Sequence, residues 1–140
     1  MKCLFTLITI SIYLIPLHAQ EVNFKTMEGT WEYKSPKGKT KMSYKFEDDH
    51  KFTSITERKE TERQIDGSYI FDKIGNLNRL IISHTPKEDG TKTITSYYLI
   101  KFSGTDTIKT QYVNGKQLSW LRETPKNTMI FVRKKDEAKK

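Results

Sequence analysis

The residues of this chain best suited to recognise a small molecule are aromatic side chains that recur at every second position. Tyr44 and Phe46 are spaced in this way, as are Tyr69 and Phe71. A period of two places such residues on one face of a β-strand. The sequence therefore predicts an interior face whose aromatic members are candidate cavity-lining residues: Tyr44, Phe46, Phe52, Tyr69, Phe71, Tyr98, Phe102, Tyr112, Trp120 and Phe131.

The same spacing is typical of an ordinary hydrophobic core, so an interior filled by these rings is an equal alternative. Ser96 and Thr110 fall in phase with the aromatic residues, and three of those residues are tyrosines. Tyrosine hydroxyls need hydrogen-bond partners when they are buried. A cavity that holds water or a ligand supplies such partners, which favours a hollow interior.

Residues with catalytic or metal-binding chemistry do not form a convincing pattern. Asp48, Asp49 and His50 are consecutive, but adjacent residues in a turn rarely converge on one ion, so we expect a solvated turn and no metal or cofactor. Ser83 and Ser119 lack the context of a nucleophile elbow. The acidic residues cluster in charged runs, which are typical of solvated loops. No catalytic residue is predicted, and we expect a protein that is not an enzyme.

Turn signals divide the chain into short segments and thereby predict the elements that position these residues. The spacing of 8 to 15 residues between signals is typical of an all-β sandwich or barrel. Hairpin-length links imply antiparallel neighbours, and closure removes exposed sheet edges. We therefore expect an antiparallel up-and-down β-barrel of eight to nine strands, preceded by one helical turn within 21–28 that caps its floor. The signals lie at 35–38, 48–50, 57–63, 75–76, 86–90, 104–106, 114–115 and 125–127.

A short motif marks the first strand. Gly29 allows a tight turn into the strand, and the indole of Trp31 is large enough to plug one end of a closed sheet. A Thr-Asp turn follows at Thr105 and Asp106, and an arginine, Arg133, lies near the end of the last strand.

These features resemble the lipocalins, and more closely the short bacterial lipocalin-like domains. The resemblance covers residues 27–134. It implies that Trp31 packs across the closed end of the barrel, with Asp106 in a turn at the same end and the Arg133 guanidinium stacked on the indole. Thr107 stands where the family usually has an aromatic residue, and Arg122 is an alternative stacking cation.

The amino-terminal residues have the pattern of a secretory signal peptide. Lys2 precedes an apolar run from Leu4 to Leu17, and Ala19 is suited to cleavage after it; a cut after Gln20 is nearly equivalent. Export to the periplasm or the exterior is expected, without a transmembrane segment in the mature chain. We divide the chain into a leader (1–19), a barrel domain (20–134) and a polar tail (135–140), and the single cysteine, Cys3, leaves with the leader.

Charge and architecture together suggest a binding function. The formal net charge is +8 at pH 7, but export argues against a nucleic-acid partner. The leading hypothesis is a carrier that holds a small apolar or amphipathic molecule in the barrel cup, with a cationic rim that favours anionic head groups. The alternative is a protein-interaction module, such as a protease inhibitor or an envelope assembly partner, that uses the loops at 57–63 and 86–90.

Overall fold

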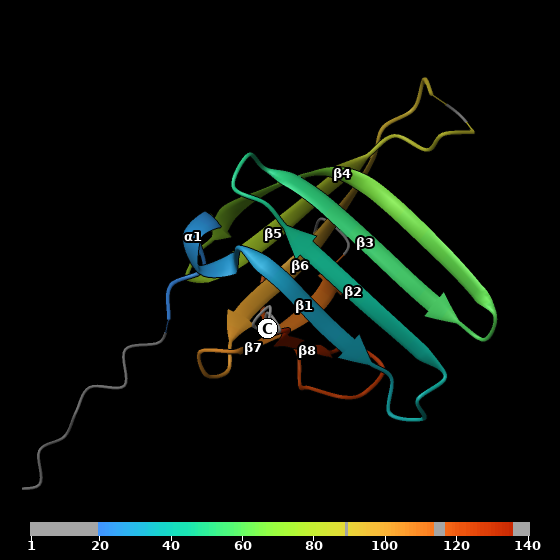
Figure 1. Ribbon diagram of the computed structural model, residues 1–140. Coiled ribbons are helices and arrows are strands. Elements are labelled where there is room, and N and C mark those ends of the chain that lie inside the picture. Colours follow the sequence, from blue (N-terminus) through green and yellow to red (C-terminus); the bar gives the residue numbers. More distant parts are fainter. Residues whose placement is uncertain (1–19, 89, 114–116, 136–140) are drawn as a thin grey trace, which may run out of the picture.

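The computed structural model describes residues 20–88, 90–113 and 117–135. One helical turn and eight strands follow each other along the chain, and each strand pairs antiparallel with the next until β8 returns to β1 (Figure 1). The predicted closed up-and-down barrel is thereby confirmed, whereas the leader lies outside the described residues. The elements are α1 (Phe24–Met27), β1 (Gly29–Lys34), β2 (Thr40–Phe46), β3 (Lys51–Arg58), β4 (Thr61–Ile74), β5 (Leu77–His84), β6 (Ile94–Phe102), β7 (Thr107–Val113) and β8 (Met129–Arg133).

The register of the strands follows the alternation of apolar and polar residues. Phe46 of β2 lies opposite Phe52 of β3, and Tyr44 lies opposite Ser54, so each pair faces the interior together. A slip of one residue would turn both aromatic rings of β2 into water. The period-two pattern thus determines which face of the sheet closes inward.

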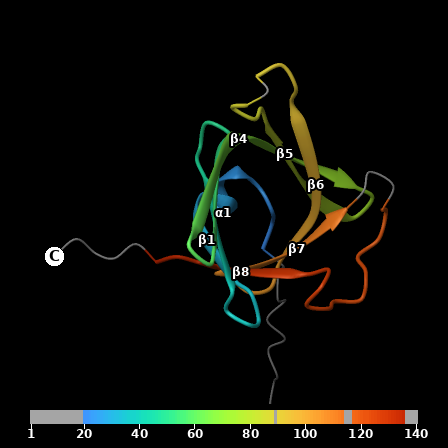
Figure 2. The same cartoon turned by 90° about the vertical axis from the view of Figure 1, so that its right-hand side faces the viewer.

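The helical turn α1 covers one end of the barrel. Asn23 begins it with a capping box, because its side chain accepts a hydrogen bond from the backbone of Thr26, whose hydroxyl accepts one from the backbone of Asn23. Met27, the last residue of α1, is fully buried. Figure 2 shows the strands in a ring with α1 inside its outline. No helix in the described part of the chain has the length and apolarity needed to cross a bilayer.

The two ends of the barrel are built differently. The closed end carries α1, the turns that follow β2, β4 and β6, and the end of β8. The open end carries the links β1–β2, β3–β4, β5–β6 and β7–β8. At the seam, only two residue pairs join β1 to β8, Trp31 with Arg133 and Glu32 with Val132, so the remainder of both strands toward the open end is unpaired across the seam.

Two expectations from the sequence differ from the structure. The segment around Leu118 to Arg122, which alternates as a strand would between the turn signals at 114–115 and 125–127, is part of an irregular connection, here called the strap (residues 117–128), between β7 and β8. The charged run at 57–63 is not a loop, because it forms the ends of β3 and β4 around a tight turn at Lys59 and Glu60. This hairpin projects from the barrel in Figure 1, so its charged side chains remain in water although its backbone is paired.

The long strand β4 serves two neighbours in turn. Its first half, Thr61 to Ser68, pairs with β3, and its second half, Ser68 to Ile74, pairs with β5. Gly67 lies at the change-over, where a Cβ atom would be 2.3 Å from the carbonyl oxygen of Ser83. Only glycine permits this approach of two backbones.

Candidate functional site

Trp31 and Arg133 seal the closed end. The indole of Trp31 is fully buried, and its Nε1 donates a hydrogen bond to the carbonyl of Met27 at 2.8 Å. The Arg133 guanidinium lies 4.1 Å from the ring centroid. Its two terminal nitrogens donate to the carbonyls of Glu28 at 2.5 Å and Thr26 at 2.6 Å. Together these side chains satisfy the carbonyl groups at the end of α1, which the helix itself leaves without partners.

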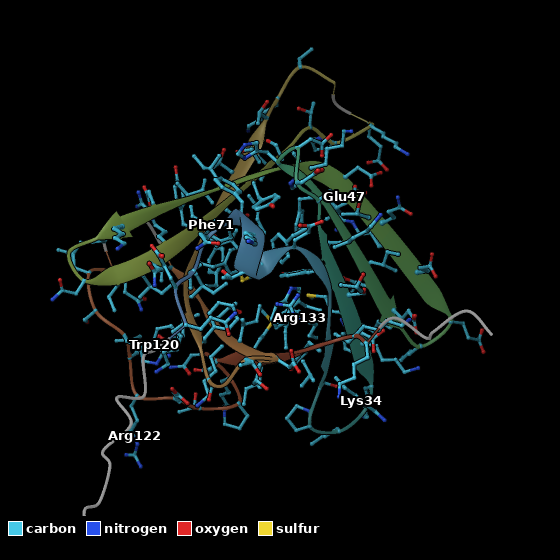
Figure 3. All side chains as sticks on the ribbon, turned by 60° about the vertical axis from the view of Figure 1, so that its left-hand side comes forward. Lys34, Glu47, Phe71, Trp120, Arg122 and Arg133 are labelled. Carbon is cyan, nitrogen blue, oxygen red and sulfur yellow. The ribbon has the colours of Figure 1, made fainter. Side chains whose placement is uncertain are left out.

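Gly29 and Asp106 complete this arrangement. Gly29 has a φ of +110°, and a Cβ atom there would lie 3.3 Å from Nη1 of Arg133. The backbone N–H of Arg133 donates to the carbonyl of Asp106, and the Asp106 carboxylate lies 3.4 Å from Nε of Arg133. The alternative cation, Arg122, is exposed on the strap and stands apart from Arg133 (Figure 3). Arg133 is therefore the stacking residue.

Most of the predicted aromatic residues pack against one another in the closed half of the barrel. Tyr44 stacks on Phe131 at 4.5 Å between ring centroids, and Phe46 contacts Tyr69 at 4.9 Å. The hydroxyl of Tyr69 donates to the carbonyl of Glu47 at 2.8 Å, and burial raises the pKa of this tyrosine to about 12. Phe52 joins the same block, Phe71 packs at its edge, and Phe102 contacts the Trp31 ring. The closed half is a filled core, which corrects its interpretation as cavity lining.

Above this core lies a group of inward-facing hydroxyl-bearing side chains, here called the cup floor: Tyr44, Ser96, Tyr98 and Thr110. The region between the cup floor and the open end is here called the cup. Burial, followed by interaction with the Tyr98 hydroxyl, raises the pKa of Tyr44 well above its ordinary value. Burial also raises the pKa of Tyr98, against the opposing effect of hydrogen bonds with Tyr44 and Ser96. Both hydroxyls are therefore neutral near pH 7 and act as hydrogen-bonding groups.

Thr110 is the unusual member of the cup floor. Its side chain is only 1% exposed, and its hydroxyl has no hydrogen-bond partner among the described residues. The register places Thr110 opposite Ile100 of β6 and Met129 of β8. Tyr98, two residues before Ile100, is the next inward-facing residue of β6 toward the open end. A buried hydroxyl without a partner costs about 1–3 kcal/mol, so this position is polar at the expense of stability.

Two predicted lining residues lie elsewhere. Tyr112 is 64% exposed at the rim of the cup, where its ring contacts Tyr98 at 5.5 Å. Trp120 belongs to the strap and lies outside the barrel (Figure 3). Its ring covers the Lys101 ammonium at 4.0 Å, and its Nε1 donates to Glu123. The prediction that Trp120 lines the cavity is wrong, because its segment is not part of the sheet.

Two polar clusters hold the strap against the outer face of β6 and β7. Glu123 contacts Lys101 at 2.9 Å and Lys109 at 2.6 Å, and these two cations lower the pKa of its carboxyl to about 2. The buried amide of Gln111 bonds to both backbone groups of Leu121 and to the hydroxyl of Thr128. The strap thereby replaces the strand expected at this place in the sequence.

The open end contains a hollow that we call the mouth hollow. Its volume is about 680 Å³, which is within the usual range of ligand pockets. It is formed by the β1–β2 link, the tip of the β3–β4 hairpin and the strap. Its lining residues are Tyr33, Ser35, Pro36, Lys37, Lys39, Thr40, Arg58, Lys59 and Pro125. None of the predicted aromatic residues lines it.

A second hollow, the seam groove, adjoins the mouth hollow where β1 and β8 diverge. It has a volume of about 290 Å³ and shares Tyr33, Pro36 and Pro125 with the mouth hollow. Ile130, an exposed residue of β8, lies on its wall. Lys34, Glu123, Thr124 and Thr128 complete its lining, and its apolar contacts come from Tyr33, Pro36, Pro125 and Ile130.

The sequence contained a partial signal for these missed residues. The alternation that turns Phe52 and Ser54 of β3 toward the interior also turns Arg58 toward it, at the open end of the strand. The position of Arg58 could therefore have been predicted from the period of two. Pro36 and Pro125 gave no such signal, because only closure of the barrel brings the two turns together.

The remaining candidates for chemistry do not form a site. Asp49 pairs with Lys51, which lowers the pKa of its carboxyl, and His50 packs on Phe24 at 4.1 Å. Within residues 20–88, 90–113 and 117–135, no three His, Asp or Glu side chains are close enough to share a metal ion. Comparison of the chain with protein-family models, with curated proteins and with solved structures found no match.

Proposed function

We propose that this chain is an exported, lipocalin-like binding protein that holds a small apolar or amphipathic molecule at the open end of its barrel. It is a non-enzymatic function that requires no cofactor. The observation that carries this proposal is the buried Thr110 hydroxyl, which has no hydrogen-bond partner among the described residues and belongs to the cup floor together with the Tyr44 and Tyr98 hydroxyls. A ligand that places one polar group there provides the missing hydrogen bond.

The seam groove at the open end supports an amphipathic ligand rather than a purely polar one. The seam groove offers apolar contacts from Tyr33, Pro36, Pro125 and Ile130. Apolar walls with a few placed polar groups are the usual composition of small-molecule sites. The filled aromatic core below the cup limits how deeply such a molecule enters.

The proposal is tested by isolating the protein from its natural compartment and measuring its mass under native conditions. We expect a co-purifying molecule that organic extraction removes. The extracted protein should then bind an apolar fluorescent probe, and Thr110→Val should weaken binding of ligands that carry a polar group. A protein that is free of ligand and leaves apolar probes unbound would overturn the proposal.

A second candidate function, protein recognition, is favoured by one observation. The first half of β4 pairs with β3 along one edge, and no described strand pairs with its other edge. A groove of about 250 Å³ lies at this free edge, between Arg63–Asp66 and His84–Glu88. Both loop regions suspected from the sequence therefore border one groove, although Asp89 lies outside the described residues. An inhibitor or assembly partner using this edge would add an extended peptide to β4.

This alternative has its own test. Gln64→Pro removes one backbone donor from the free edge of β4, because the N–H of Tyr69 faces β3 and N–H groups alternate along a strand. Replacing residues 85–88 with Gly and Ser removes the opposite wall. Both changes should abolish capture of a protein partner while probe binding in the cup persists. Unchanged partner capture by folded variants would exclude the groove as the contact surface.

A further inference from the structure

The mouth hollow has a strongly uneven charge distribution. Four cationic residues, here called the cationic rim, line it: Lys37, Lys39, Arg58 and Lys59. No carboxylate is among its lining residues, and none of these four makes an ion pair within the described part of the chain. Glu57 pairs with Lys41, and Glu123 pairs with two lysines of β6 and β7. Glu60 and Glu62 belong to the same hairpin as Arg58 and Lys59 but do not line the hollow.

The rim comes from two connections that the closed barrel brings together. Lys37 and Lys39 lie in the link between β1 and β2, whereas Arg58 and Lys59 end β3 and begin its turn. Lys59 has a φ of +56°, a conformation that non-glycine residues seldom adopt. Four like charges around one hollow repel each other, and a bound anion relieves that repulsion.

An apolar bed lies directly beside these charges. Pro36, Pro125 and Tyr33 belong to both the mouth hollow and the seam groove, and Ile130 extends the apolar surface along β8. The seam groove of about 290 Å³ extends from these shared residues to Ile130, so a hydrocarbon chain can follow it. Lys34 and Glu123 also line it, and Glu123 is neutralised by its two lysine partners. A molecule that fits both parts has an anionic head and one hydrocarbon chain.

We infer that the mouth hollow and the seam groove together form a binding site for a single-chain anionic amphiphile, such as a long-chain carboxylate or alkyl phosphate. The cationic rim holds the head group, and the bed of Tyr33, Pro36, Pro125 and Ile130 holds the chain. This inference rests on the proposed function and adds the ligand's charge, its shape and its place outside the filled core.

The decisive comparison uses two probes with the same chain, dodecanoate and dodecan-1-ol, below the concentration at which they form micelles. Calorimetry at pH 8 should show dodecanoate binding about tenfold more tightly than the alcohol at low salt, and the advantage should shrink on addition of salt. The variant Lys39→Gln/Arg58→Gln should lose most of this advantage while its binding of the alcohol stays unchanged. The control variant Lys25→Gln/Lys73→Gln removes two exposed cations that lie outside the mouth and have no ion pair among the described residues, and it should behave as the parent protein.

The outcomes separate this inference from the proposed function. Equal affinity for the two probes in the parent protein overturns the head-group site but leaves the carrier function intact. Binding of neither probe overturns both. Displacement of dodecanoate by inorganic phosphate at a similar concentration identifies a simple anion site and overturns the role of the chain. A last outcome also overturns the inference: the parent protein binds vesicles of anionic phospholipid and the rim variant does not, while both bind dodecanoate equally. The rim would then bind a membrane surface.

Discussion

Replacement of Thr110 by valine should stabilise the protein. Valine has nearly the same shape as threonine and suits a strand, and the side chain here is only 1% exposed with no partner for its hydroxyl among the described residues. In the unfolded chain that hydroxyl is hydrated, so folding carries a desolvation cost of about 1–3 kcal/mol that valine avoids. We expect the free energy of unfolding to rise by about 1 kcal/mol or more, which corresponds to about 4 °C in the melting temperature of a domain of this size.

The same substitution at Thr128 is the matched control. Thr128 is 8% exposed, and its hydroxyl accepts from Gln111 at 2.9 Å and donates to Asn127 at 2.9 Å. Thr128→Val breaks both bonds and leaves a buried amide donor unsatisfied, so it should destabilise the protein by about 1–2 kcal/mol. The two variants remove the same atom from buried threonines, yet the expected changes have opposite signs.

Urea unfolding followed by far-ultraviolet circular dichroism measures both changes. The slope of the transition should stay constant, so that the midpoints report stability directly. If Thr110→Val lowers the midpoint as much as Thr128→Val does, the Thr110 hydroxyl is satisfied in solution. The cup floor would then lack the free polar group on which the proposed function depends.

Three further changes test other parts of the structure. Arg133→Lys should lower the free energy of unfolding by about 1–3 kcal/mol in urea titrations, because an ammonium cannot stack on Trp31 and bond two carbonyls at once; an unchanged midpoint would contradict this role. Glu123 has a pKa of about 2 in the folded protein against 4.5 ordinarily, so its anchoring of the strap is complete above pH 4.5 and is lost as pH falls toward 2; the fluorescence of Trp120 should change in that range, and Glu123→Gln should remove the transition. Gly67→Ala should cost about 1–3 kcal/mol, and crystallography should show β4 displaced from β5; a well-folded variant with native melting temperature would refute the close approach.

The barrel and its closed end could be predicted because their signals are local. Tyr44 and Phe46 alternate with lysine and serine, and this period determines the face on which they lie. Gly29 and Trp31 are separated by one residue, so the turn and the plug are visible together. The sequence near Trp31 could not decide between Arg122 and Arg133 as the stacking residue. That depends on which arginine the last strand, β8, places beside the indole when it pairs with β1.

The strap could not be predicted from alternation alone. Leu118, Trp120 and Arg122 alternate as a strand would, but the segment is held by side chains rather than by a backbone ladder. The useful signal lies on its neighbours: Leu99 and Val113 are apolar on the outward phase of β6 and β7 and are buried. An outer face of a barrel that carries buried apolar residues requires a cover, and the strap provides it.

The difference between the two ends of the barrel explains why binding is proposed at the open one. At the closed end, Trp31 and Arg133 satisfy the last carbonyls of α1. At the open end, the Thr110 hydroxyl has no partner among the described residues. β1 and β8 do not pair with each other between the Glu32–Val132 pair and the open end. Regions with few backbone bonds open at lower free-energy cost than the rest of a fold. A rigid, satisfied base can therefore hold the sheet in shape while the seam moves enough to admit a chain between Tyr33 and Ile130.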